Sequence, residues 1–528
     1  PEQIKSQFNP EPTSDPRMSY ALAPAVDDFS DVVKTLSNVD LIDAIDVEKF
    51  ADNKEIGKYL VERNQQLQKE NNIDLKTETG EYTDEQIEII SDVVTREALN
   101  EIVNNPKNAG AWYSTNIENA IKLLGDIYPE ILSDKNARTT FVVGLAITSN
   151  GQAPSSNLKY ALQVYDFYKK NNRFPETEEE FDSAGSVSPS MREGFVKYNN
   201  LVIEFGLDDA NQFLNTRFKA GEINYITGHK PSKEKVDQEL PGSAIFGPKI
   251  GGAFYPNLQG AYEYVTMDRW FMRTMGRITG ELTNNIEDLK PQIDRFRNTL
   301  LKTKGQIVKL GHKKTGIKLD EKKYPLQFKY NRKKIIKEYN IDEDLLKTDD
   351  NYAISKASEI LRPYANNGYK NKTELNLSVN NLVKKVVQLI DSPRNGGQII
   401  SFRKIMQIAT DKVNQKVKEN NIEFSKLYPA DLQAIIWFPE KRLFGKLRKS
   451  KSILRETSYE DEAREILKSR GYDDKRITNI LNTNENYATK GGAFNQENEK
   501  SFRLDPVDPD ELSEDSFENL DFDTKIKE

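Results

Sequence analysis

The chain has 528 residues, a formal net charge of −7 and a mean hydropathy of −0.72. It contains no cysteine and two histidines, His229 and His312, which excludes disulfides, thiolate metal sites, cysteine nucleophiles and any site built on three histidines of one chain. The negative net charge excludes a general attraction to nucleic acid, so such binding needs local basic patches. A carboxylate site for a cation stays open, but we predict neither a metal nor a cofactor.

The sequence of the first part of the chain predicts an extended arm followed by helices. Residues 1–26 are rich in Pro, Ser and Asp and predict the arm, and residues 27–108 predict an N-terminal helical region. Helical spacing of apolar residues indicates helices near Asp27–Phe50 and Lys54–Asn71. A third helix begins with a capping box at Thr83 and runs to about residue 105.

Residues 109–300 predict a helical core of two lobes. Its segment Ala137–Thr148 is almost entirely apolar or small, which indicates a buried central helix. We expect a basic linker at 301–350, a C-terminal helical domain at 351–484 and an acidic, disordered or draped tail at 485–528. Long runs of alternating polar and apolar residues are missing from the sequence, so the predicted fold class is all-α.

The stretch from Leu240 to Gly280 combines glycine turns, a lysine, aromatic residues and an aspartate before an amphipathic segment. Backbone N–H groups at glycine turns bind phosphates, and a following helix N-terminus adds partial positive charge. Asp268 precedes the helical pattern and is expected at its N-terminus. Three arginines follow at helical spacing, which puts them on one stripe as candidate DNA contacts: Arg269, Arg273 and Arg277.

The segments GPKIGGAFYPNLQG and VTMDRWFMRTMGRI resemble the helix–hairpin–helix motif and downstream aspartate of the HhH-GPD DNA glycosylases. The resemblance implies that Gly247, Gly251 and Gly252 form a hairpin that grips phosphates. It implies that Lys249 attacks the sugar C1′ as an amine nucleophile and that Asp268 is the essential carboxylate. Each residue also has a non-catalytic interpretation. Lys249 would then be an exposed turn residue or a phosphate contact, and Asp268 a helix N-cap.

The most basic segment lies between residues 301 and 337 and carries thirteen cations against the two acids Asp320 and Glu321. We expect a phosphate-binding surface there, with candidate contacts at Lys313, Lys314, Lys333 and Lys334. A second basic patch spans Lys441–Lys451. The glutamates near residues 176–182 are expected to be solvated rather than metal ligands.

Two functions remain open. The first is a phage-type DNA glycosylase or glycosylase/lyase, and the second is a non-enzymatic virion protein whose helical fold contacts DNA or other virion proteins. Apolar runs of membrane-spanning length and a signal-peptide core are both missing from the sequence. We therefore expect no membrane span and a location in the host cytoplasm or inside a virion, with the oligomeric state open.

Overall fold

The computed structural model describes residues 28–37, 50, 53–77, 79–104, 112–181, 188–226, 239–284, 286–301, 332–365, 374–386, 388–420, 426–448 and 458–483. Within these residues the fold is all-α, as predicted, because the only strands there are two three-residue segments. The chain divides into two compact units, and each is built from separated stretches of sequence. Unit 1 comprises residues 1–115 and 262–457, and unit 2 comprises residues 116–261 and 458–528.

Unit 1 contains one helix cluster whose centre is α6 (Asp84–Asn104), packed against α21 (Gly396–Glu419) and α22 (Pro429–Arg448). The predicted capping box at the start of α6 is confirmed, because Thr83 and Gln86 exchange hydrogen bonds. Small polar residues let α21 approach closely, since the Ser91 hydroxyl lies 3.3 Å from the Ile405 carbonyl. The remaining helices of this cluster are α3 (Asp31–Leu36), α5 (Asn53–Glu70) and α15 (Arg269–Thr279).

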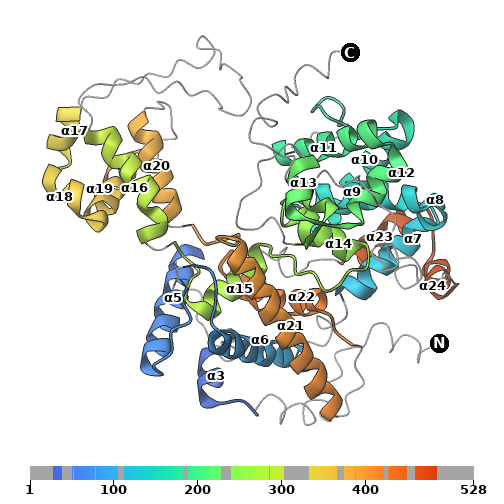
Figure 1. Cartoon of the computed structure of the whole chain (residues 1–528), viewed down its shortest axis with the longest axis horizontal. Coiled ribbons are helices and arrows are strands. Elements are labelled where there is room, and N and C mark those ends of the chain that lie inside the picture. Colours follow the sequence, from blue (N-terminus) through green and yellow to red (C-terminus); the bar gives the residue numbers. More distant parts are fainter. Residues whose placement is uncertain are drawn as a thin grey trace, which may run out of the picture. The chain divides into compact units, whose positions relative to one another are not determined.

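A second cluster of unit 1 is a bundle with its own hydrophobic core, hereafter the α16–α20 bundle (Figure 1). It comprises α16 (Ile286–Leu301), α17 (Arg332–Glu338), α18 (Glu343–Thr348), α19 (Asp350–Ala365) and α20 (Glu374–Val386). Leu289 and Phe296 of α16 share that core with Leu382 of α20. An ion pair of 2.6 Å joins Arg297 to Asp350, which fixes α16 to the start of α19.

Unit 2 surrounds α9 (Lys135–Thr148), whose burial from Thr139 to Thr148 confirms the predicted central helix. The chain returns to this unit at α23 (Tyr459–Ser469), where the Asn157 amide donates a 2.6 Å hydrogen bond to the Tyr459 hydroxyl. The other helical elements are α7 (Glu118–Gly125), α8 (Glu130–Ser133), α10 (Pro154–Asn171), α11 (Pro189–Phe205), α12 (Leu207–Leu214), α13 (Ala220–Ile226), α14 (Tyr255–Leu258), α24 (Asp474–Thr483), the 3₁₀ turn η3 (Gly242–Phe246) and the π turn η4 (Ile250–Phe254). Strands β1 (Arg217–Lys219) and β2 (Glu239–Pro241) pair antiparallel, with Phe218 opposite Leu240. A further π turn, η2 (Trp112–Ile117), precedes α7.

These units cross the expected domain boundaries. The expected core at 109–300 is divided, because residues 116–261 belong to unit 2 whereas α15 and α16 belong to unit 1. The boundaries expected at 300 and 350 fall inside the α16–α20 bundle, whose apolar residues form one core. The expected arm at 1–26 and tail at 485–528 lie outside the described residues, as does the second half of the expected helix Asp27–Phe50.

Candidate functional site

The glycine stretch of unit 2 satisfies its own backbone donors. The N–H groups of Gly251 and Gly252 both donate to the Gly247 carbonyl at 3.0 Å, and the Gly247 N–H donates to Ala244 at 2.8 Å. Gly251 and Gly252 are buried between the turns η3 and η4. The expectation that these three glycines grip a phosphate is therefore corrected, because their N–H groups point at carbonyls of the same segment.

Close contacts with backbone carbonyls of neighbouring segments explain why glycines occupy these positions. A Cβ atom on Gly251 would lie 1.5 Å from the Ser243 carbonyl oxygen, and one on Gly242 would lie 2.1 Å from that of Phe213. Gly247 has a φ of +97°, a conformation that side chains disfavour. The Ser243 hydroxyl donates a 2.6 Å hydrogen bond to the Gly251 carbonyl and holds η3 against η4. The glycines thus allow two turns to pack together.

Two neighbouring glycines provide a matched test of this explanation. Gly251→Ala is expected to destabilise unit 2 by about 1–3 kcal/mol, because the added methyl overlaps a backbone atom that must move. Gly252→Ala is expected to stay near wild type, because its nearest neighbour would be the Gly247 oxygen at 3.8 Å. Hydrogen exchange of the α9 amides measures both changes. Equal losses in the two variants would contradict the close-packing explanation.

Lys249 and Asp268, the two predicted catalytic residues, belong to different units, and each directly precedes a helical element. Lys249 is partly exposed and precedes η4 in unit 2. Asp268 is the N-cap of α15 in unit 1, where its carboxylate accepts a 2.9 Å hydrogen bond from the Phe271 N–H. The expected position of Asp268 at a helix start is therefore confirmed, and capping explains an aspartate there.

The arginine stripe of α15 mostly faces inward. Arg277 is fully buried, and its guanidinium binds Glu97 through two hydrogen bonds of 2.8 and 2.9 Å and also contacts Glu440. Burial alone would lower the pKa of Arg277, but the two carboxylates outweigh it and raise that pKa. The prediction that Arg277 contacts DNA is corrected, because its charge is neutralised inside the core.

The other two arginines of the stripe differ in exposure. The Arg273 side chain is 7% exposed, lies 5.1 Å from the Trp270 ring and is 3.9 Å from Asp391. The predicted DNA contact at Arg273 is likewise corrected, because the side chain is covered. Arg269 is 55% exposed and forms a 3.3 Å ion pair with the same Asp391, so it alone of the three reaches the surface.

The aromatic side chains of the stretch lie mainly in the cores. Phe254 and Tyr255 are buried in unit 2, and Tyr264 is buried in unit 1. The Tyr255 hydroxyl donates a 2.7 Å hydrogen bond to Asn215, and burial raises the pKa of this tyrosine. These three rings are therefore packed residues and do not form a platform for a flipped base.

The glutamates after α10 act as loop anchors. Glu180 accepts hydrogen bonds from Arg173 and from the N–H groups of Glu176 and Thr177. The Arg173 hydrogen bond, together with these N–H groups, lowers the pKa of Glu180 to about 2. Among the described residues, groups of three or more potential metal-ligand side chains are absent. Both histidines, and Asp182 of this acidic segment, lie outside those residues.

The lowered pKa of Glu180 gives a pH dependence of known sign. Ionised Glu180 stabilises the folded loop above its unfolded pKa of 4.5, and this contribution is lost as the pH falls from there to about 2. In Arg173→Gln the Glu180 pKa is expected to rise toward its ordinary value. Carboxylate NMR titration of both proteins measures it, and an unchanged pKa in the variant would contradict the assigned cause.

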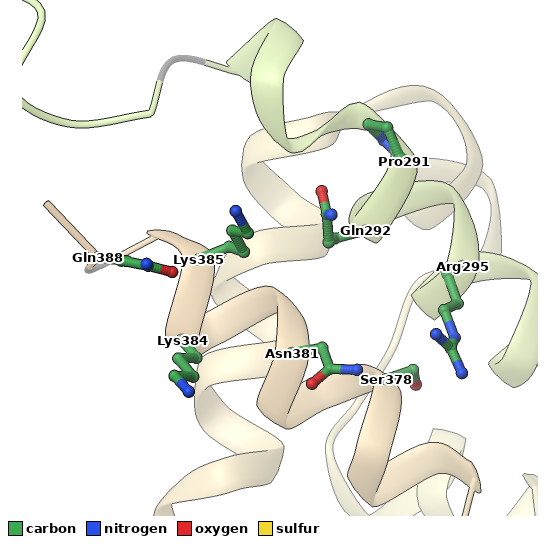
Figure 2. A pocket seen from close by; sticks show the side chains of 8 residues that line it. All are labelled: Pro291, Gln292, Arg295, Ser378, Asn381, Lys384, Lys385 and Gln388. Atoms are coloured by element: carbon green, nitrogen blue, oxygen red, sulfur yellow. The ribbon is translucent and has the colours of Figure 1, made fainter. Parts of the chain in front are cut away.

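A polar pocket in the α16–α20 bundle offers a different site (Figure 2). It has a volume of about 390 Å³ and lies between α16 and α20. Three cationic side chains line it, namely Arg295 from α16 and Lys384 and Lys385 from α20, and all three are exposed to solvent. The other lining residues are uncharged: Pro291, Gln292, Ser378, Asn381 and Gln388. We call this the α16–α20 pocket.

Sequence reasoning missed the α16–α20 pocket, although its residues follow a readable pattern. Ser378, Asn381 and Lys385 recur at three- and four-residue spacing, which places them on one side of α20, and Gln388 follows that helix in the sequence. Their partners on α16 lie about ninety residues earlier in the chain. A pattern within one helix does not reveal which other helix packs beside it.

The predicted basic contacts are only partly described. Lys333 is exposed on α17, in the same bundle as the pocket. Lys313 and Lys314 lie outside the described residues, and so does the side chain of Lys334. Of the second basic patch, Lys441 is buried in unit 1, with its amine 4.9 Å from the Trp437 ring centre.

Comparisons with known proteins find no match to this chain among protein-family models, curated proteins or solved structures. In the part of the chain that the structure describes, helices long and apolar enough to cross a membrane are absent.

Proposed function

We propose that the chain binds DNA without catalysis and that the α16–α20 pocket is its binding site. One observation carries this proposal: Arg295, Lys384 and Lys385 line one pocket whose described lining residues include no carboxylate. Cations on a protein surface normally have acids among their neighbours, as Lys290 has Asp350 in the same bundle at 3.0 Å. A local excess of positive charge favours a ligand that carries phosphates.

The charge distribution along the sequence supports the same bundle. The chain is acidic overall, so attraction to DNA must come from a restricted region. Of the thirteen cations between residues 301 and 337, nine lie between α16 and α17 in the sequence and four belong to α17, where Lys333 is exposed. The basic segment therefore follows α16 of the pocket directly in the sequence, and its cations add to the charge available for binding several phosphates.

The test is a titration of fluorescein-labelled DNA with the full chain, followed by anisotropy at several salt concentrations. We expect binding at 50 mM salt that weakens by at least about tenfold at 200 mM, because each neutralised phosphate releases counterions. Bovine serum albumin, another acidic protein, controls for non-specific capture. Absence of binding at 50 mM salt, or binding that does not change with salt, would overturn the proposal.

A glycosylase/lyase is the second candidate, and the partial exposure of Lys249 before η4 supports it. It requires Lys249 to form a Schiff base with an abasic sugar, which borohydride reduces to a stable covalent complex. Trapping by the wild type that is lost in Lys249→Ala would establish this candidate. The non-catalytic proposal predicts no trapped complex, with a known glycosylase/lyase as the positive control.

A phage virion is the setting that we propose for this protein. The composition of residues 1–26, rich in Pro, Ser and Asp, and of the acidic residues 496–528 supports it, because such sequences suit segments that order against a partner. Twelve acids against four bases between residues 496 and 528 give that end a charge opposite to the pocket. Detection of the chain in purified particles, together with protection from external protease, tests this setting.

A further inference from the structure

The α16–α20 pocket is larger than the contact of one phosphate requires. Its volume of about 390 Å³ falls within the range of about 300–1,000 Å³ found for pockets that enclose whole small molecules. Its three cations come from two helices and supply charge for more than one backbone phosphate. A phosphate alone would leave most of the pocket to water, so the pocket suits a phosphate that carries further groups.

The uncharged lining residues indicate what those groups are. Gln292, Asn381 and Gln388 each carry a side-chain amide, with a donor and an acceptor on the same group. The Gln292 Oε1 atom is buried and has no hydrogen-bond partner within the protein. An unsatisfied buried acceptor costs about 1–3 kcal/mol, and rotation of the Gln292 amide toward a ligand that donates a hydrogen bond removes this cost. Nucleobase edges present donors and acceptors of this kind.

We infer that the α16–α20 pocket binds one unpaired nucleotide of a DNA strand, with neighbouring backbone phosphates at the cations and the base edge at the amides. This inference rests on the proposed function. In a duplex the base edges are paired and stacked, so only a backbone phosphate reaches the pocket and Gln292 remains unsatisfied. A single strand turns its bases outward and delivers both parts of the ligand.

The composition of the pocket also predicts how the strand is held. Aromatic residues are absent from the eight lining side chains shown in Figure 2, so base stacking contributes little. Proteins that bind single strands through stacking gain about 1–3 kcal/mol per base from it. Here the charges and the amides must supply the affinity, so binding should depend strongly on salt and on Gln292 and Asn381.

The experiment compares single-stranded and hairpin-duplex DNA with equal numbers of phosphates, using the full chain and anisotropy. Wild type is expected to prefer the single strand by about tenfold, equivalent to one or two hydrogen bonds. Gln292→Ala/Asn381→Ala should remove that preference and leave duplex binding within about twofold. The matched control is Asn298→Ala/Gln415→Ala, which truncates two exposed amides outside the pocket and should behave as wild type.

A competition arm separates a nucleotide from a simple anion. A deoxynucleoside monophosphate should displace the labelled strand at a concentration at which inorganic phosphate does not. Equal affinity for both DNA forms, or equal competition by phosphate, would overturn the unpaired-nucleotide inference while leaving DNA binding intact. Loss of binding to every DNA form would instead overturn the proposed function itself. Tighter binding of a single-stranded RNA of equal length would overturn DNA as the ligand.

Discussion

Replacement of Arg277 by alanine is expected to lower the local free energy of unfolding around α6 by about 3–5 kcal/mol. The substitution removes the guanidinium that both Glu97 and Glu440 contact, and all three side chains are at most 1% exposed. Two buried carboxylates would then lose the guanidinium that binds both of them. Burial already raises the pKa of Glu440 against the opposing effect of Arg277.

Native-state hydrogen exchange of the α6 amides measures this loss and avoids treating a chain of two units as one cooperative transition. Arg269→Ala is the matched control, since it lies on the same helix but is 55% exposed, and it should cost about 0.5 kcal/mol or less. The triple change Arg277→Met/Glu97→Gln/Glu440→Gln should recover most of the stability, because all three charges of this buried cluster are removed together. Similar protection in Arg277→Ala and Arg269→Ala would contradict the assigned role.

Removal of the pocket charges is expected to have the largest effect on DNA binding. Arg295→Gln/Lys384→Gln/Lys385→Gln should weaken single-strand affinity at 100 mM salt by about 100-fold or more, because up to three phosphate contacts of about 1–1.5 kcal/mol each are lost. All three side chains are exposed at the pocket, so the substitutions should leave the α16–α20 core intact. Anisotropy with a labelled oligonucleotide measures the change.

The control removes the same number of charges from the same unit. Lys58→Gln/Lys404→Gln/Lys418→Gln changes three exposed lysines outside the pocket and gives the same net charge as the pocket variant. It should reduce affinity by less than about threefold, because these three lysines do not line the pocket and salt screens exposed charges that make no direct contact with the phosphates. A loss as large as that of the pocket variant would mean that total charge, rather than the pocket, sets the affinity.

Local patterns predicted the helices well because local chemistry determines them. The apolar run Ala137–Thr148 predicted a buried helix, and α9 is buried over most of its length. Thr83 and Gln86 predicted the start of α6, and Asp268 predicted the start of α15. Each of these signals depends on residues within a few positions of one another, so one sequence is sufficient.

Contacts between distant segments could not be predicted in the same way. Arg277 matched an exposed stripe in the sequence, but its partner Glu97 is 180 residues earlier and its partner Glu440 is 163 residues later. The glycines around Gly251 indicated a phosphate loop, whereas their close contact with Ser243 emerges only when η3 and η4 are placed together. The α16–α20 pocket likewise needs two helices that a long basic segment separates.

The salt dependence of single-strand binding, compared between wild type and Arg295→Gln/Lys384→Gln/Lys385→Gln, tests the central claim most directly. The slope of log affinity against log salt should become shallower by about 2 in the variant, since each phosphate contact on a single strand contributes about 0.7. The Lys58→Gln/Lys404→Gln/Lys418→Gln control should keep the wild-type slope. An unchanged slope in the pocket variant would contradict the claim that these three cations neutralise phosphates.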